Sequence, residues 1–373
     1  MHIAIATDAW HPQINGVVRT LEALAASMEA LGSTVEFITP VGFASLPLPT
    51  YPGLRCALPG PTAIAARIER ARPDAVHIAT EGPIGFMVRR YCLAKGLPFT
   101  TSFTTRFPEY IAARVPFPIA WGYAALRRFH GKASVTMVST PSLMAELTHR
   151  GFANLKLWSR GVDTRLFRPE RALDLCMPRP IFLSVGRIAP EKNLDAFLAL
   201  DLPGTKVVIG HGPQEAELRA RFPAAKFLGA LCGEALAAHI ASADVFVFPS
   251  RTDTFGIVQL EALACGVPVA AYPVTGPKDV IGSRPVGVLS EDLGRACQEA
   301  LKLSRAACRR HALAFSWERS ASEFLEHMRS VALPDARAHM RVPMEHSIGI
   351  VNKVEPGSRR RMRPAWRGAA VSR

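Results

Sequence analysis

Short apolar runs rich in β-forming residues alternate with segments of helical period, and the alternation occurs twice along the chain. In the first half the runs occupy residues 2–7, 34–39, 74–79, 99–102 and 134–139. In the second half they occupy residues 181–185, 206–209, 225–228, 245–248 and 267–271. This alternation is typical of parallel sheets with helices on both faces, so we predict two doubly wound α/β units.

The two units meet in residues 160–180, where Pro and Gly interrupt the periodicity. We therefore expect a first domain over residues 1–159 and a second over residues 160–330. A chain of 373 residues with 49% hydrophobic and 20% charged residues can fill two cores. Ligands of such sheets bind beyond the carboxyl ends of the strands, so we expect the site in the cleft between the domains.

Positive charge is concentrated in the first domain and in the C-terminal segment. The net charge of +14 divides into +6 for residues 1–158, +2 for residues 159–330 and +6 for residues 331–373. The last segment shows no helix or strand pattern, so we expect a disordered basic tail. A basic surface attracts anionic lipid, nucleic acid or acidic substrate, and a tail without any role is an equal alternative.

Several classes of protein lack support in the sequence. The seven Cys are scattered without CxxC or Cys/His clusters, which favours a reducing cytoplasm and no zinc site. Neither Asp-x-Asp nor a His/Asp set with metal spacing occurs, so we expect no metal cofactor. The chain opens as a strand rather than as a secretory signal, and no window reaches the roughly 18 apolar residues of a membrane span. Specific nucleic-acid binding would rest on charge alone.

Two segments carry features suited to phosphate. Gly16 opens a helix after the first strand and lets the backbone approach a ligand at the positive end of that helix. A tight Asn-Gly turn is the alternative. In the second domain, GRIAPEKN (186–193) follows a strand, and its Arg187 and Lys192 can both reach phosphate oxygens. As an isolated pair they could equally be solvated loop charges.

A third segment, DTFGIVQLE (253–261), enters a helix. Its first residues offer free backbone N–H groups to a phosphate; they are Phe255, Gly256, Ile257 and Val258. Glu261 can accept hydrogen bonds from ribose hydroxyls, and Asp253 is placed for sugar hydroxyls. The alternative is that Asp253 caps the helix and Glu261 pairs with a neighbour.

Together the three segments predict a site for a sugar nucleotide. A departing nucleoside diphosphate needs its charge neutralised, either by a divalent cation or by fixed cations and backbone dipoles. Arg187, Lys192 and two helix N-termini can provide the second arrangement. We therefore expect metal-independent glycosyl transfer.

Several stretches resemble, in order, the retaining family 4 glycosyltransferases of the GT-B fold. They are TDAWHPQINGVVRT (7–20), HIATEGPIG (77–85), RGVDTRLFRP (160–169), GRIAPEKN and SRTDTFGIVQLEALACGVPVAAYPVTGP (250–277). Within that family, they resemble the bacterial branch of lipid-modifying mannosyl-, glucosyl- and sulfoquinovosyltransferases. The resemblance covers residues 1–330 and implies two Rossmann-like domains that face each other across a cleft.

The resemblance also implies roles for individual residues. Gly16 would approach the donor diphosphate, and Arg187 and Lys192 would bind it. Asp253 and Glu261 match the two acidic positions of the family signature, the first of which is usually Glu. The nucleotide pocket and the edge of the base site would be formed by Gly210, Gly212, Phe227, Leu228 and Gly229.

One position departs from the family pattern. The stretch 101–110 is similar to a family segment in which His commonly stands at Thr104, lining the sugar pocket. Thr cannot exchange a proton near neutral pH as imidazole does. Thr104 could keep only a positioning role, turnover could be slow, or the acceptor could differ. Arg106, Glu109 and Tyr110 become candidate acceptor contacts, with an ordinary surface loop as the alternative.

Residues 105–132 combine five basic side chains and one acidic side chain with interspersed aromatic residues. This mixture suits the headgroup boundary of an anionic bilayer, although a helix packed on the core of the first domain would also explain it.

We therefore expect a peripheral enzyme at the inner face of the cytoplasmic membrane. It would move a hexose from GDP-mannose or a UDP-hexose to a lipid or glycan acceptor with retention. A GT-B nucleotide-sugar epimerase and a nucleotide- or polyanion-binding scaffold without turnover are the alternatives. The GxGxxG motif of dinucleotide oxidoreductases does not follow the first strand.

Overall fold

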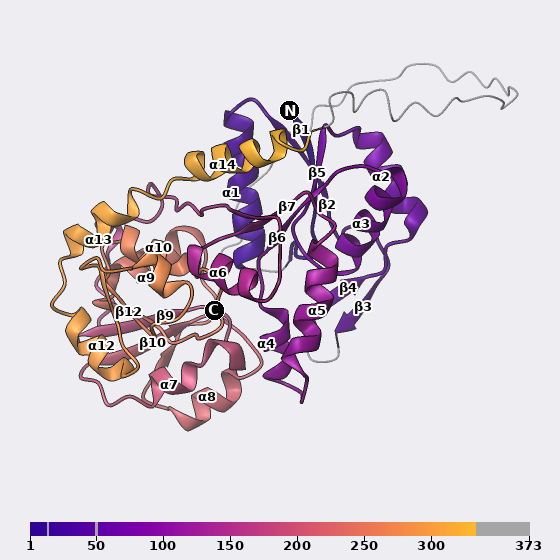
Figure 1. Cartoon of the computed structure of the whole chain (residues 1–373). Coiled ribbons are helices and arrows are strands. Elements are labelled where there is room, and N and C mark those ends of the chain that lie inside the picture. Colours follow the sequence, from indigo (N-terminus) through magenta and orange to yellow (C-terminus); the bar gives the residue numbers. More distant parts are fainter. Residues whose placement is uncertain (13–14, 49–50, 333–373) are drawn as a thin grey trace, which may run out of the picture. The chain divides into compact units, whose positions relative to one another are not determined.

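The computed structural model describes residues 1–12, 15–48 and 51–332 (Figure 1). Within that part the chain forms two six-stranded parallel sheets and a two-stranded antiparallel hairpin. Gln13 and Ile14 of the first motif lie outside the described residues. The predicted basic tail also lies outside them from residue 333 onward.

The first sheet has the strand order β2-β1-β5-β6-β7-β8. Its strands are β1 (His2–Ala6), β2 (Thr34–Ile38), β5 (Ala75–Ile78), β6 (Thr100–Phe103), β7 (Val135–Val138) and β8 (Leu155–Leu157). The hairpin joins β3 (Ser45–Leu48) to β4 (Tyr51–Ala57). Helices of this half are α1 (Gly16–Ala30), α2 (Pro61–Ala71), α3 (Pro83–Lys95), α4 (Phe107–Ala112), α5 (Ile119–His130) and α6 (Pro141–His149).

The second sheet is also parallel and has the order β11-β10-β9-β12-β13-β14, with three strands before the reversal of strand order where the first sheet has two. Its strands are β9 (Ile181–Val185), β10 (Thr205–Ile209), β11 (Lys226–Phe227), β12 (Val245–Phe248), β13 (Val269–Ala271) and β14 (Gly287–Leu289). The α-helices are α7 (Leu194–Leu198), α8 (Glu215–Arg221), α9 (Gly233–Ser242), α10 (Ile257–Ala264), α11 (Pro277–Val280), α12 (Leu293–Ala300), α13 (Arg305–Ala312) and α14 (Trp317–Arg329). Two short 3-10 helices are η1 (Pro169–Arg171) and η2 (Pro190–Lys192).

Each sheet is covered on both faces because alternate residues of its strands point to opposite sides. In β1, Ile3 and Ile5 pack in a cluster with α1 and α14, whereas Ala4 packs in another with α2, α3 and α5. In β9, Ile181 packs in a cluster with α9, α10 and α13, and Phe182 in one with α7, α8 and α12. The predicted doubly wound α/β architecture is therefore confirmed for both halves.

Helix α14 departs from the predicted division of the chain at residues 159 and 160. Its Phe324 and Leu325 are buried in the same cluster as Ile3 and Leu21 of the first half. The helix therefore packs on the first sheet, although the prediction placed it with the second half. An apolar helical stripe shows that a helix must be covered, but it does not show which sheet covers it.

Candidate active site

The strand order of each sheet reverses at one point, and the loops that carry the sequence motifs follow the strands at that point. In the first sheet these are the loops after β1 and β5, and in the second they are the loops after β9 and β12. Loops that diverge from a reversal of strand order leave a crevice at the carboxyl edge of a parallel sheet. The predicted phosphate-binding segments therefore lie where the topology places ligand sites.

An ion pair joins the two loops of the second half. Lys192 lies at the end of η2, and its Nζ donates to Oδ1 of Asp253 at 2.6 Å. Burial lowers the pKa of Lys192, but Asp253 and the neighbouring Tyr110 and Glu191 raise it, and the net pKa is above the usual value. Lys192 is therefore charged, and its side chain is 24% exposed.

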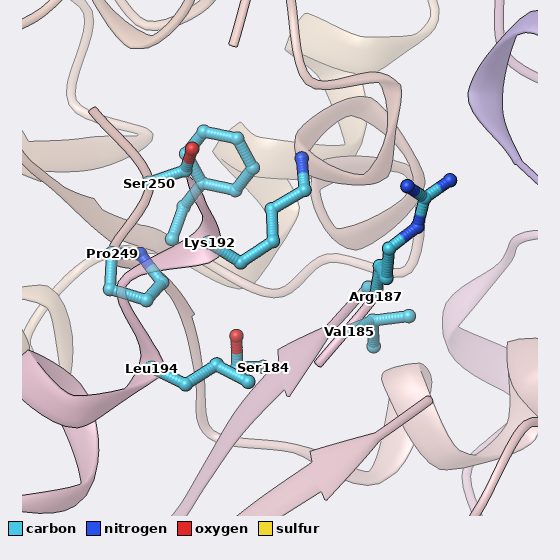
Figure 2. Close-up of a pocket in the computed structure, with 9 residues that line it drawn as sticks. Ser184, Val185, Arg187, Lys192, Leu194, Pro249 and Ser250 are labelled. Carbon is cyan, nitrogen blue, oxygen red and sulfur yellow. The ribbon is translucent and has the colours of Figure 1, made fainter. Parts of the chain in front are cut away.

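Arg187 extends from the end of β9 beside Lys192 (Figure 2). The two cations line the same small pocket, whose other residues are Ser184, Val185, Gly186, Leu194, Phe248, Pro249 and Ser250. Oδ2 of Asp253 is buried and has no hydrogen-bond partner within the described part of the chain. A buried carboxylate oxygen without a partner is costly, so this atom is placed to accept from a ligand hydroxyl.

Glu191 lies between the two cations in sequence and is buried beneath them. Its Oε2 accepts from Arg114 at 2.6 Å, and its Oε1 lies 3.9 Å from Arg187. Hydroxyls of Ser250 and Thr252 donate to its backbone oxygen at 3.1 and 3.3 Å, which ties the loop after β9 to the loop after β12. These bonds hold the cation-bearing loop in one geometry.

The N-termini of α1 and α10 lie close together. Asn15 caps α1 by accepting from the N–H groups of Val17 and Val18 at 3.0 Å each. A Cβ built on Gly16 would lie 4.0 Å from Cγ2 of Ile257, the first residue of α10. The positive ends of two helix dipoles therefore lie close together where a diphosphate is predicted, although the N–H groups of Val17 and Val18 are already bonded to Asn15.

Glu261 projects from α10 and is 2% exposed. Its Oε1 lies 2.5 Å from the guanidinium of Arg19 on α1. Its Oε2 is buried and, among the residues described, has no hydrogen-bond partner. Both alternatives for Glu261 thus have support, since it pairs with a neighbouring cation and still keeps one free acceptor atom.

Glycines hold the loops of the second half in close contact. A Cβ on Gly210 would lie 1.9 Å from the oxygen of Gly186, and one on Gly212 would lie 2.1 Å from the oxygen of Ile188. The GHGP turn therefore packs directly beneath the loop after β9, and only glycine fits there. Beside it, Gly229 accepts from the N–H of Gly210 at 2.8 Å. These contacts explain the glycines structurally, while their contact with a nucleotide stays a prediction.

The remaining predicted base-site residues lie at the end of β11. Phe227 is buried in the core of the second half, and the N–H of Leu228 donates to Val208 at 3.0 Å. In the donor segment, Phe255 is also a core residue, whereas Gly256 takes a positive φ of 79° at the start of α10. Val258 follows it in the first turn. Backbone rather than side chains would therefore meet the nucleotide at these positions.

Thr104 meets the second half through its backbone. Its oxygen accepts from the hydroxyl of Thr254 at 2.8 Å, next to Asp253. Tyr110 also reaches this region, because Lys192 and Asp253 both act on its hydroxyl while burial raises its pKa to about 12. The structure thus places Thr104 and Tyr110 beside the predicted donor site.

Arg106 and Glu109 belong to a network inside the first half. Arg106 makes two bonds to Glu146, at 2.9 and 2.6 Å. Glu109 accepts from the hydroxyl of Tyr123 at 2.7 Å. Arg106 is buried, so its position suits a structural role, and contact of either residue with an acceptor stays a prediction.

The comparisons with known proteins agree with this geometry. The profile described as Glycosyltransferase Family 4 matches residues 14–166, and the one described as Glycosyl transferases group 1 matches residues 179–304. A GDP-mannose-dependent alpha-mannosyltransferase of Mycolicibacterium smegmatis is 30% identical over 369 residues, which cover 89% of this chain and 98% of that protein. The chain belongs to the family 4 glycosyltransferases.

This family 4 glycosyltransferase is also similar to a second sequence relative and to a solved structure. A sulfoquinovosyl transferase of Arabidopsis thaliana is 31% identical over 261 residues, covering 65% of this chain and 51% of that protein. The solved structure of sucrose-phosphate synthase from Thermosynechococcus elongatus has a TM-score of 0.72 at 20% identity, covering 88% of this chain and 98% of that one. The GT-B fold and the enzymatic class predicted from the sequence are confirmed.

Three charged residues of this glycosyltransferase were not predicted for the site. They are Arg19, Arg114 and Glu191. Arg19 and Glu191 lie inside the quoted motifs, so their charge next to a predicted phosphate-binding segment could have identified them as site residues. For Arg114, no local pattern identifies a partner so distant in sequence. Among the described residues, no group of three or more His, Cys, Asp or Glu side chains is placed to hold a metal ion.

Proposed function

We propose that this enzyme transfers a hexose from a nucleoside diphosphate sugar to a lipid or glycan acceptor, with retention and without a metal ion. The observation that carries the proposal is the group formed by Arg187, Lys192 and Asp253 beside the N-termini of α1 and α10. The similarity to a GDP-mannose-dependent mannosyltransferase over 89% of the chain favours GDP-mannose as donor, with a UDP-hexose as the second candidate.

Fixed positive groups would stabilise the charge that develops on the leaving diphosphate. Lys192 and Arg187 would meet its oxygens, and the first N–H groups of α10 together with the dipoles of α1 and α10 would contribute the rest. The bond from the anomeric carbon to the phosphate oxygen breaks while the bond to the acceptor oxygen forms on the same face. The acceptor proton passes to the leaving phosphate oxygen, so the step needs no imidazole at Thr104.

The surface of α4 and α5 supports a lipid acceptor. Tyr123 and Phe129 of this segment are buried, which accounts for part of its aromatic content. Phe107, Ile111 and Trp121 are exposed, and Trp121 is 72% exposed. Aromatic and aliphatic side chains near several arginines suit the boundary of an anionic bilayer. Nowhere in the described ranges does a helix have the length and hydropathy to span a bilayer. We therefore propose peripheral contact, at the cytoplasmic face of the membrane.

A vesicle assay tests this contact. Trp121→Ser should weaken binding to anionic vesicles roughly tenfold, because a large apolar side chain no longer enters the interface. Leu173→Ser is the matched control, since Leu173 is an exposed apolar residue of the second half. Equal binding of the wild type and both variants would remove α5 from the interface.

The donor is tested by thermal shift with GDP, UDP, ADP and their sugars. A ligand that binds only the folded state at a hundred times its Kd stabilises by about 2.7 kcal/mol. Transfer is then measured with and without EDTA, and the anomeric configuration of the product is read by NMR. Loss of activity in EDTA would overturn metal independence, and an inverted product would overturn retention. Interconversion of sugar nucleotides without transfer would favour the epimerase.

A further inference from the structure

An ion pair between the two halves reaches into the predicted ribose site. Arg19 lies in the first turn of α1, and its guanidinium is 2.5 Å from Oε1 of Glu261. The Arg19 side chain is 33% exposed, whereas that of Glu261 is 2% exposed. A cation of the first half is therefore the charge partner of a carboxylate buried in the second half.

The pair occupies only one oxygen of the carboxylate. Oε2 of Glu261 is buried, and no donor to it exists within the described ranges. Burial of a half-satisfied carboxylate is unfavourable unless a further donor completes it. Ribose hydroxyls are donors of the required kind, and the N-terminus of the same helix faces the predicted diphosphate position.

We propose that Arg19 is a positioning residue for the donor, which holds Glu261 charged and oriented so that Oε2 accepts hydrogen bonds from the ribose hydroxyls. This inference rests on the proposed donor site. It implies that the ribose subsite is assembled from both halves, since its carboxylate comes from α10 and the counterion of that carboxylate comes from α1.

Arg19 is the one charge that acts on Glu261 among the described residues, while the arginines of α13 act on Cys265 and bind backbone oxygens. Arg309 of α13 donates to the backbone oxygens of Phe167, Ala264 and Thr164 at 2.7–2.9 Å. Arg305 of α13 donates to Ala243 and Ala241 at 2.7 and 2.8 Å.

Cys265 lies at the C-cap of α10, one turn beyond Glu261. Its pKa is raised to about 12 by burial and by Glu261, so it is neutral. Arg19 is thus the cation on which the charge of Glu261 depends.

The binding experiment compares a nucleotide with and without its ribose hydroxyls. Calorimetry measures the Kd of whichever of GDP and UDP the wild type binds, and of its 2′,3′-dideoxy form. Arg19→Gln should weaken binding of the complete nucleotide by roughly tenfold to a hundredfold, the usual effect of losing a hydrogen bond to a charged group. The dideoxy form should be affected much less, so the preference for the ribose hydroxyls should shrink.

Two variants accompany this measurement. Arg19→Lys keeps the cation and should restore most of the binding. Glu22→Gln is the matched control, because Glu22 lies on the same helix and pairs with the exposed His11 instead. In transfer assays Arg19→Gln should raise KM for the donor, while KM for the acceptor stays unchanged.

The pH dependence provides a second readout. Burial raises the pKa of Glu261, and Arg19 opposes that rise. Without Arg19 the pKa rises further, so the carboxyl becomes partly protonated as the pH falls and loses its charge-assisted acceptor strength. The binding defect of Arg19→Gln should therefore be several-fold larger at about pH 6 than at about pH 8.5, and Arg19→Lys should show the wild-type profile.

The outcomes separate the inference from the proposed function. If the wild type binds neither nucleoside diphosphate, the donor site itself is wrong. If the wild type binds and Arg19→Gln binds equally well or more tightly, Arg19 is no positioning residue. Equal weakening of the complete and dideoxy nucleotides, without pH dependence, would also overturn the inference.

Discussion

Buried charges are paired differently in the two halves of the molecule. In the first half, Arg106 pairs with Glu146 of the same half at 2.6 Å, and the buried Glu81 lies 3.0 Å from the ring of His130. In the second half, Glu261 and Glu191 take arginines from the first half. The second half thus depends on the first half for part of its charge pairing.

This difference predicts which substitutions should affect activity and which should affect the stability of the fold. Groups paired within the first half maintain its fold whether or not the halves meet. In the second half, Asp253 is paired with Lys192 of the same half, whereas Glu261 and Glu191 meet their arginines only when α1 and the segment after α4 lie against them. A site of this kind is complete only when residues of both halves contribute to it.

The sharpest test of the second half is Lys192→Ala. Loss of a fixed cation at the leaving diphosphate should lower kcat about a hundredfold or more, the usual effect of removing one preorganised stabilising group. Steady-state transfer assays measure this, with circular dichroism to verify the fold. Lys226→Ala, at an exposed lysine of the same half, should leave transfer unchanged. Unchanged turnover in Lys192→Ala would remove the diphosphate assignment.

A test across the two halves is Arg114→Gln. Glu191 loses its 2.6 Å ion pair and then attracts Arg187, which lies 3.9 Å away, more strongly. Arg187 should therefore bind the diphosphate less well, and KM for the donor should rise about tenfold, as for the loss of one charge-assisted contact. Donor titrations at saturating acceptor measure this effect.

Arg106→Gln is the matched control, because it removes an arginine whose partner, Glu146, lies in the same half. We expect a loss of about 2 kcal/mol in the free energy of unfolding, since Glu146 loses its bidentate partner, and no change in KM for the donor. A rise in KM for the acceptor would instead favour the predicted acceptor contact of Arg106. If Arg114→Gln and Arg106→Gln changed KM for the donor equally, arginines paired between the halves and arginines paired within one half would not differ in their effect on donor binding.

Most strands and the principal site residues were predictable because their signals are local. The predicted run 181–185 coincides with β9, and the run 134–139 contains β7. Motif spacing placed Lys192 and Asp253 on loops that the strand order then brings within 2.6 Å. Apolar periodicity and Gly positions depend on the local backbone conformation, so strands and the loops that follow them can be predicted from the sequence.

The pairing of charges between the halves could not be predicted in the same way. Arg19 and Glu261 are far apart in sequence, and either could have been a solvated surface charge. The position of α14 was missed for a related reason, since two sheets offered an equally apolar face. The hairpin β3–β4 lay in a Pro-rich stretch without clear alternation. Long-range partners depend on how the halves meet, which local patterns do not encode.

The smallest effect is expected at Thr104, where the two halves touch through Thr254. Its hydroxyl makes only a long contact of 3.5 Å to the oxygen of Ala79, so little is lost when the side chain changes. Thr104→His should therefore preserve kcat or raise it by about threefold, less than the usual gain from general acid–base catalysis, because the leaving phosphate already takes the acceptor proton. Transfer assays and thermal unfolding are measured together. A variant that unfolds would show that position 104 does not line the sugar pocket, whereas a folded variant with much higher kcat would show that proton transfer limits the natural enzyme.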